Sequence, residues 1–181
     1  MRATAFGFLA AAGFALVGAP ALAAAPTLCA ANEQVVFSCS TGAHTASICA
    51  SRDLLKDAAM QYRFGKSGSV ELVYPEAGVK PADAFTLGTL AFSGGGGVWL
   101  RFNKGPFRYT IFTADGKWGR GGTIAEASGV TVEKDGKEFA NFPCRGGAES
   151  EMSPDLFEKL GLKEAAEEFD IPDAFLPKSA R

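Results

Sequence analysis

The sequence contains a single histidine, His44, and little net charge, with 18 Lys and Arg residues against 20 Asp and Glu residues. A mildly acidic chain lacks the basic surface with which proteins bind nucleic acid, and also the lysine clusters that hold proteins to anionic lipid. No motif fixes a Ser, Cys or Asp partner near His44, so no catalytic triad can be recognised. We expect this histidine to be a turn residue.

Motifs for nucleotide and metal binding are also missing. The stretch from Gly65 to Ser67 matches the end of a phosphate-binding loop, but that loop requires a glycine at the position of Met60 and a helix after the motif. Here a strand-like alternation follows instead. The spacing Cys39-x4-His44-x4-Cys49 is wider than the two to four residues that usually separate zinc-binding cysteines. We therefore expect no nucleotide, metal or other cofactor.

The one long apolar run lies at the N-terminus. Arg2 precedes an apolar segment from Ala5 to Val17, and small residues ending in Ala21-Leu22-Ala23 follow. This order is typical of a secretory signal peptide, and the run is too short for a membrane-spanning helix. The sequence predicts cleavage near Ala23, so that residues 1–23 are removed. The mature chain is then expected to be periplasmic or secreted in a bacterium, with no membrane span.

The four cysteines all lie in the part predicted to be exported: Cys29, Cys39, Cys49 and Cys144. An even number of cysteines in an oxidising compartment predicts two disulfides. With a two-residue turn between "QVVFSC" and "TASICA", Cys39 and Cys49 fall on opposite faces of a hairpin. That geometry favours pairing Cys29 with Cys49 and Cys39 with Cys144. A different turn length places both on one face and leaves the pairing open.

Residues 24–147 are predicted to form one disulfide-bonded β domain. Short alternating runs rich in β-branched and aromatic residues recur between tight turns, as in "GVTVEKDGKEFANF" around Asp135-Gly136. About nine such strands lie between Cys29 and Cys144, and only Ser51 to Ala59 has a helical pattern. Short strands without intervening helices predict an all-β fold, either an antiparallel β-sandwich or a small β-barrel.

The stretch "MQYRFGKSGSVELVYP" predicts one of the hairpins of this domain. A Gly/Ser-rich turn separates its two alternating runs. With a loop from Gly65 to Ser69, Arg63 lies opposite Glu71, and such a cross-strand charge pair helps to fix the register.

Residues 148–181 differ in character and are predicted to form a short helical tail. Ser153 is suited to cap a helix that has Pro154 at its first position and ends at Gly161. A second short helical pattern runs from Lys163 to Phe169. Both runs are short and weakly amphipathic, which favours small helices or a loose acidic segment at one end of the sheet over a partner-binding helix.

Two segments are candidates for a binding surface. In a glycine run between two strands, the backbone amides can face an anion or a partner's loop, although such a run also allows another backbone to approach closely. The segment from Thr113 to Gly122 places an aromatic side chain between two cations, as in binding hot spots for protein or sugar, although that ring can also fold back onto the core. The candidate residues are Ser93, Gly94, Gly95, Gly96, Gly97, Lys117, Trp118 and Arg120.

Several motifs carry a resemblance to a known family. They are Phe37-x-Cys39, Ser47-Ile48-Cys49-Ala50-Ser51, Tyr62-Arg63-Phe64-Gly65, Glu71-Leu72-x-Tyr74-Pro75 and the Ser93-Gly-Gly-Gly-Gly run. Together they resemble a set of exported bacterial proteins with no assigned activity. The resemblance covers the chain from Cys29 to about Cys144 and leaves out the tail. It implies no particular reaction or ligand.

The motif Phe37-x-Cys39 and the late Cys144 are also similar, more loosely, to periplasmic lysozyme inhibitors of the C-type kind. Those proteins are small β-barrels that block the muramidase cleft with a Ser-Gly-x-x-Tyr loop. In this chain three glycines follow Ser93-Gly94, and the tyrosine is missing. No inhibitory residue is therefore carried over.

The sequence thus predicts an exported, non-enzymatic binding or interaction protein. Its expected partner is an unidentified protein or cell-wall glycan of the bacterial envelope. The first alternative is an inhibitor of lysozyme or of another cell-wall hydrolase. The second is a hydrolase whose acids are brought together only by the fold, because a glycosidase needs two carboxyls at a fixed separation and Asp115, Glu126, Glu133 and Asp135 form no recognisable pair.

Overall fold

A computed structural model describes residues 26–53 and 58–178. The predicted signal peptide and the middle of the helical pattern at Ser51 to Ala59 lie outside these residues. The elements are, in order, β1 (Glu33–Ser40), β2 (Thr45–Ser51), β3 (Met60–Lys66), β4 (Ser69–Tyr74), α1 (Pro81–Ala84), β5 (Thr86–Phe92), β6 (Gly95–Lys104), β7 (Phe107–Gly116), η1 (Arg120–Gly122), β8 (Ala125–Lys134), β9 (Lys137–Pro143), β10 (Glu149–Ser150), α2 (Pro154–Lys159), β11 (Lys163–Glu164) and η2 (Asp173–Phe175).

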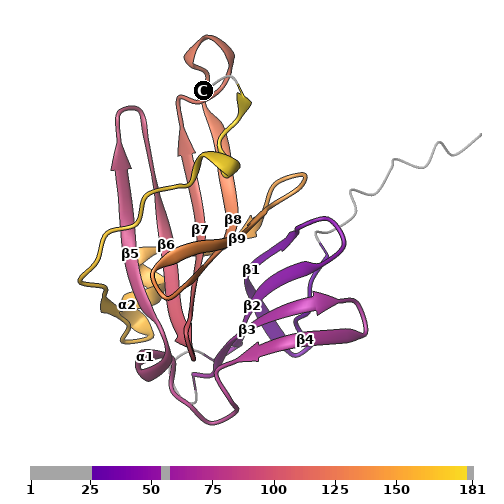
Figure 1. Ribbon diagram of the computed structural model, residues 1–181. Coiled ribbons are helices and arrows are strands. Elements are labelled where there is room, and N and C mark those ends of the chain that lie inside the picture. Colours follow the sequence, from indigo (N-terminus) through magenta and orange to yellow (C-terminus); the bar gives the residue numbers. More distant parts are fainter. Residues whose placement is uncertain (1–25, 54–57, 179–181) are drawn as a thin grey trace, which may run out of the picture.

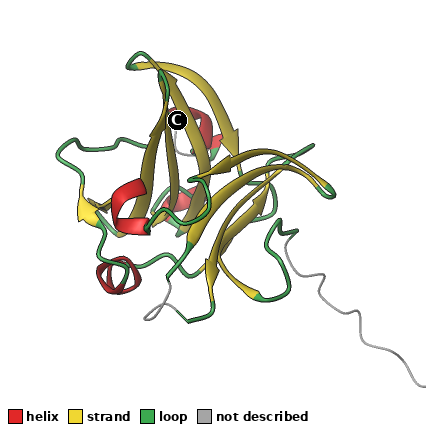
Figure 2. Cartoon of the chain, turned by 90° about the horizontal axis from the view of Figure 1, so that it is seen from below, coloured by secondary structure: helices red, strands yellow, loops and turns green. Residues whose placement is uncertain are grey.

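The strands form two sheets (Figure 1). Sheet A has the order β10-β1-β2-β3-β4, and sheet B has the order β11-β5-β6-β7-β8-β9. All the pairings are antiparallel except that of β11 with β5. Seen from below, the few helical turns lie beside the strands (Figure 2). The predicted all-β fold is confirmed as a β-sandwich with short helices, and β1 to β9 account for the expected strands.

The main core lies between the two sheets. Ala46, Ile48 and Ala50 of β2 belong to it, because alternate residues of a strand point to the same face. In sheet B the alternation places apolar side chains on both faces. Leu100 and Ile111 face the main core, whereas other residues of the same strands belong to a second apolar cluster. This outer cluster consists of Trp99, Phe112, Ala114, Ala127 and Phe175.

Both predicted disulfides are present. Cys29 is bonded to Cys49 and Cys39 to Cys144, with Cα–Cα distances of 5.3 and 5.5 Å. Ser40 pairs with Thr45, so four residues rather than two connect β1 to β2. Because the connection is longer by two residues, an even number, the same residues of each strand share a face as with a two-residue turn. Cys39 and Cys49 therefore still lie on opposite faces of the hairpin. The second disulfide joins β1 of sheet A to Cys144, the residue that follows β9 of sheet B.

The hairpin of β3 and β4 differs from its prediction. The turn is the two-residue segment 67–68, and the pairing register shifts next to Gly65. Arg63 therefore lies opposite Val73 and not opposite Glu71, so the predicted charge pair is wrong. A β-bulge adds a residue to one strand only, and this insertion is not visible in the alternation of the sequence.

The first helix of the tail forms as predicted. Ser153 precedes α2, and its hydroxyl accepts a hydrogen bond from the backbone N–H of Leu156 at 3.2 Å. Gly161 follows the helix with a positive φ of 69°. In the described part of the chain, no helix has the length and apolar character needed to cross a membrane.

The second predicted helix, from Lys163 to Phe169, does not form. Lys163 and Glu164 make up β11 instead, and the segment that follows crosses the outer face of sheet B (yellow in Figure 1). The Ala165 N–H donates to the Leu87 carbonyl at 2.8 Å, and Phe169 packs against the outer cluster. These tertiary contacts outweigh a weak helix propensity.

Candidate functional site

An apolar cavity of about 210 Å³ lies between the two sheets. It opens between the hairpin of β3 and β4 on one side and strands β7, β8 and β9 on the other. We name it the aromatic cleft. Its walls consist of Tyr62, Phe64, Leu72, Phe107, Tyr109, Val132, Phe139, Ala140 and Phe142.

Strand alternation places these side chains in the cleft. Tyr62 and Phe64 are two residues apart on β3, as are Phe107 and Tyr109 on β7. Residues at this spacing point to the same face of a strand. The β4 and β9 strands are edge strands of their sheets, so the cleft lies where the sandwich has no further strand to close it.

Aromatic rings contact one another across the cleft and along the wall that sheet B forms. The rings of Phe64 in sheet A and Phe142 in sheet B are 5.1 Å apart, and those of Phe107 and Phe139 are 5.4 Å apart. Phe139 is 63% exposed. A large exposed apolar side chain beside a concave apolar surface is typical of a binding site.

Two tyrosines supply the polar groups of the cleft. Burial raises the pKa of Tyr62, and the nearby Tyr109 adds to that shift; burial also raises the pKa of Tyr109. Both phenols therefore stay protonated at neutral pH and can donate a hydrogen bond. Within the described residues neither hydroxyl has a hydrogen-bond partner, whereas the Tyr74 hydroxyl donates to the Ala84 carbonyl at 3.2 Å.

The rim of the cleft is polar. The Lys134 ammonium lies 5.6 Å from the centre of the Phe107 ring. On the opposite side, His44 stacks on Phe64 with ring centres 5.0 Å apart, and its Nε2 lies 3.2 Å from a carboxylate oxygen of Glu71. His44 occupies the turn between β1 and β2, as expected, and this contact holds the Phe64 side chain at the edge of the cleft.

Most of the glycine run, which was predicted to be a loop, belongs to a strand. Ser93 and Gly94 form the turn between β5 and β6, and Gly95, Gly96 and Gly97 belong to β6, paired with β7. A Cβ atom at Gly97 would lie 2.5 Å from the Ala114 Cβ, closer than real side chains approach. The glycines thus allow the backbones to approach closely.

The segment that contains Trp118 lies beside this turn. Trp118 is half-buried, and its ring centre is 5.0 Å from that of Phe92 at the edge of the outer cluster. The aliphatic stem of Lys117 covers Gly94, and Arg120 is exposed. The structure therefore brings the two predicted segments together at one end of sheet B. None of their residues lines the aromatic cleft.

Sequence reasoning missed the aromatic cleft. Alternating aromatic residues were visible in the strands that carry Tyr62 and Phe64, and they indicated a buried face. The strands that meet at the cleft are distant in the sequence, and only the pairing of the sheets shows which aromatic residues face one another. A count of 15 phenylalanines was the available signal.

The zinc-like motif offers no thiolates, because Cys39 and Cys49 are both bonded in disulfides. A carboxylate of Glu33 also lies near the sulfurs of Cys29 and Cys49, which are bonded to each other.

No protein-family model, curated protein or solved structure matches the chain. The kind of molecule that the aromatic cleft can bind is therefore inferred from the residues that line it and from their geometry.

Proposed function

We propose that this protein is an exported binding protein that holds a small, mainly apolar molecule in the aromatic cleft. The observation that carries the proposal is the pair of tyrosines, Tyr62 and Tyr109, in an otherwise apolar cavity. Apolar walls give affinity through burial, and a few placed polar groups select the ligand and fix its orientation. A ligand with one hydrogen-bonding group fits this pattern.

The size of the cavity narrows the class of ligand. A cavity of about 150 Å³ lined by apolar side chains is known to bind benzene. The aromatic cleft, at about 210 Å³, has room for one aromatic ring with a substituent. Sugars and nucleotides carry many polar groups, which the apolar walls would leave without hydrogen bonds. A simple phenol fits both the volume and the chemistry.

A binding role without catalysis agrees with the residues of the walls. The nine lining residues, all in the described part of the chain, include no carboxylate, histidine, lysine or cysteine. The raised pKa values of Tyr62 and Tyr109 make both phenols poor bases at neutral pH. Export is supported by the N-terminal signal pattern and by the two disulfides, which persist in oxidising compartments.

The test is a calorimetric titration of the oxidised protein with 4-ethylphenol and, separately, with ethylbenzene. We expect the phenol to bind more tightly, by about tenfold for each hydrogen bond gained. Tyr62→Phe combined with Tyr109→Phe should remove this preference while ethylbenzene still binds. Tyr74→Phe is the matched control, because its hydroxyl bonds to Ala84 outside the cleft. Failure of both compounds to bind at millimolar concentration would refute the proposal.

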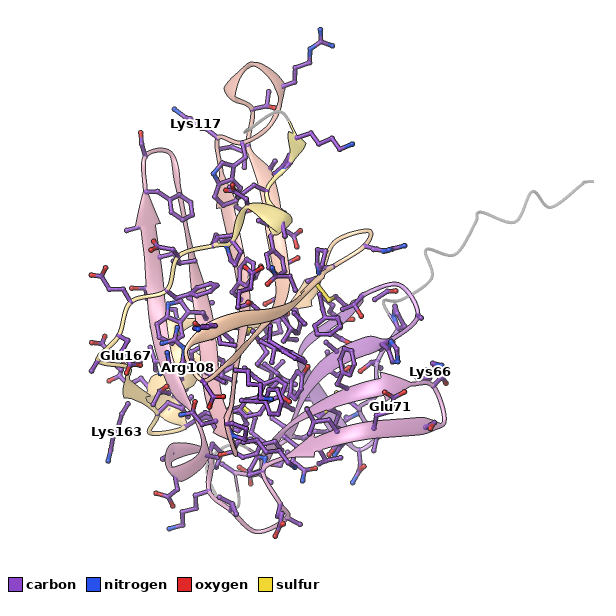
Figure 3. The ribbon with its side chains drawn as sticks, in the orientation of Figure 1. Lys66, Glu71, Arg108, Lys117, Lys163 and Glu167 are labelled. Atoms are coloured by element: carbon purple, nitrogen blue, oxygen red, sulfur yellow. A yellow bond between two sulfur atoms is a disulfide. The ribbon has the colours of Figure 1, made fainter. Side chains whose placement is uncertain are left out.

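A second candidate, inhibition of a cell-wall hydrolase, is supported by a different feature. The turn between β5 and β6 and the segment between β7 and β8 extend beyond sheet A (Figure 1). Lys117 lies at this end (Figure 3), and Arg120 is close to it in sequence and exposed. A projecting basic tip suits a cleft that contains catalytic carboxylates.

A peptidoglycan-lysis assay against a panel of lysozymes tests this candidate. Inhibition near one-to-one stoichiometry that is lost on Lys117→Ala combined with Arg120→Ala would support it. Lysis that is unchanged across the panel would eliminate it, and this outcome would leave the phenol-binding experiment unaffected.

A further inference from the structure

A second concave surface lies on the far side of sheet B, along the edge of β5. The tail pairs with this edge over two residues only, Lys163 opposite Thr86 and Glu164 opposite Leu87, and then diverges. The space between them, about 420 Å³, is lined by residues 87–92 of β5, by Trp99 and by residues 164–170 of the tail. We name it the β5 slot.

One wall of the β5 slot is an open strand edge. The Leu87 carbonyl accepts a hydrogen bond from the Ala165 N–H, so the backbone groups of Leu87 point toward the tail. The pairing of β5 with β6 is regular, and alternate residues direct their backbone groups to the same edge. Thr89 and Ala91 therefore direct their backbone N–H and C=O groups into the slot. In the described residues, no strand pairs with these groups.

Trp99 lies at the floor of the slot and is 2% exposed. Its indole rests against Gly88, where no side chain intervenes, and the guanidinium of Arg101 lies 4.3 Å from the centre of the ring. Among the described residues, no hydrogen bond joins the indole N–H to an acceptor, and this atom is not one of the fully buried polar atoms that lack a partner. A largely buried aromatic ring whose N–H is not fully buried offers a ligand both an apolar face and a donor.

The opposite wall is acidic. It carries Glu164, Glu167, Glu168 and Asp170. Only Glu167 forms ion pairs within the described chain, at 3.5 Å to Arg101 and 3.6 Å to Arg108; the labels of Figure 3 place Arg108 and Glu167 close together. The remaining three carboxylates are exposed and leave the slot with a net negative charge.

We propose that the β5 slot binds an extended basic peptide segment by strand addition to β5. Such a segment would pair its backbone with Thr89 and Ala91, as in known cases of β-augmentation. About four residues fit along the edge from Gly88 to Phe92 at about 3.3 Å per residue. Successive side chains would point toward the apolar floor around Trp99 and away from it, and a lysine or arginine of the second set is long enough to reach the exposed carboxylates of the acidic wall. This arrangement selects a pattern of alternating apolar and basic residues.

The experiment uses the peptide acetyl-KVKVK-amide, with acetyl-EVEVE-amide as its charge-reversed partner. Binding is followed by Trp99 fluorescence in a Trp118→Phe background and by calorimetry. The basic peptide should bind at least tenfold more tightly, and added salt should weaken its binding. Glu168→Gln combined with Asp170→Asn should reduce the affinity several-fold. The matched control is Glu149→Gln combined with Glu151→Gln at the edge of sheet A. This control should leave the affinity for the basic peptide unchanged.

Peptide N-methylation tests the backbone pairing without changing the protein. Methyl groups on alternate amides remove the donors on one edge of the peptide and leave the other edge intact. One of the two alternate patterns should abolish binding and the other should retain it, since only one edge can face β5. Equal effects of both patterns, equal affinity for the acidic peptide, or no binding at millimolar concentration would overturn the proposal. A self-associated protein whose slot is filled by a second copy, as detected by sedimentation, would also overturn it.

Discussion

Removal of the two disulfides should destabilise the protein to different extents. Cys39 and Cys144 are 105 residues apart in sequence, and Cys29 and Cys49 are 20 apart. The loss of loop-closure entropy in the unfolded chain predicts a cost of about 4.7 kcal/mol for removing the long-range bond and about 3.3 kcal/mol for the short-range one. In this estimate, the difference between the two costs arises from the lengths of the closed loops alone.

Packing increases the difference. Cys39 has no exposed surface and belongs to the main core, so replacing it by alanine also leaves a small cavity, which costs about 1 kcal/mol more. The same bond joins sheet A to the end of β9, whereas the Cys29–Cys49 bond holds the segment before β1 against β2. With a urea slope of about 2 kcal/mol per molar, the midpoint should fall by about 1.6 M without the short-range bond and by about 2.5 M or more without the long-range one.

The assay is urea unfolding of two double-alanine variants, followed by circular dichroism under oxidising conditions. Each variant retains the other disulfide, so each serves as the control for the other. An unfolding midpoint that is equal in the two variants, or lower without the Cys29–Cys49 bond, would refute this reasoning. Such a result would show that loop length does not set the relative contributions of the two bonds.

Three further outcomes follow from the structure. Hydrogen bonds from Arg63 hold the pKa of Glu33 below 4.5, against an opposing effect of burial, so the pair stabilises the fold above pH 4.5 and loses this effect as the pH falls through the folded-state pKa. Glu33→Gln should cost about 1.5–3 kcal/mol at pH 7, and its pH–stability curve should meet that of the parent at low pH. Gly88→Ala should cost about 1–3 kcal/mol in thermal unfolding, because the Trp99 indole occupies the position of the new methyl group, and a Trp99→Phe background should reduce this cost. Burial raises the pKa of Tyr62 far above 10, so a spectrophotometric titration should leave at least this tyrosine protonated at pH 11, and stability should fall as the pH rises above 10.

Features that depend on local alternation could be predicted from the sequence. The strands and the cystine pairing follow from which residues share a face, and they survive a turn of four residues in place of two. The bulge at Gly65 could not be seen in the same way, because one inserted residue changes the partner of Arg63 without changing the character of either strand. Only the observed pairing of β3 with β4 therefore shows which residue lies opposite Arg63.

The tail and the aromatic cleft could not be predicted, because both depend on surfaces that only the folded chain creates. Lys163 to Phe169 has a weak helical pattern, but the edge of β5 and the apolar outer face of sheet B offer it better contacts. Phe64 and Phe142 meet only because the two sheets pack face to face. Sequence reasoning found the projecting turns, where composition is unusual, and missed the cleft, where ordinary strand residues converge.

The pairing of β10 with β1 bears on the aggregation of the newly made chain. Phe37 pairs with Ser150, and the Glu151 N–H donates to the Val36 carbonyl at 2.8 Å, so the last part of the chain covers the outer edge of a strand that is made first. Until that part is synthesised, an apolar strand edge stays open and can pair with the same strand of another chain. Products that end before residue 149 should therefore aggregate, whereas chains that include residues 149–151 cover this part of the edge.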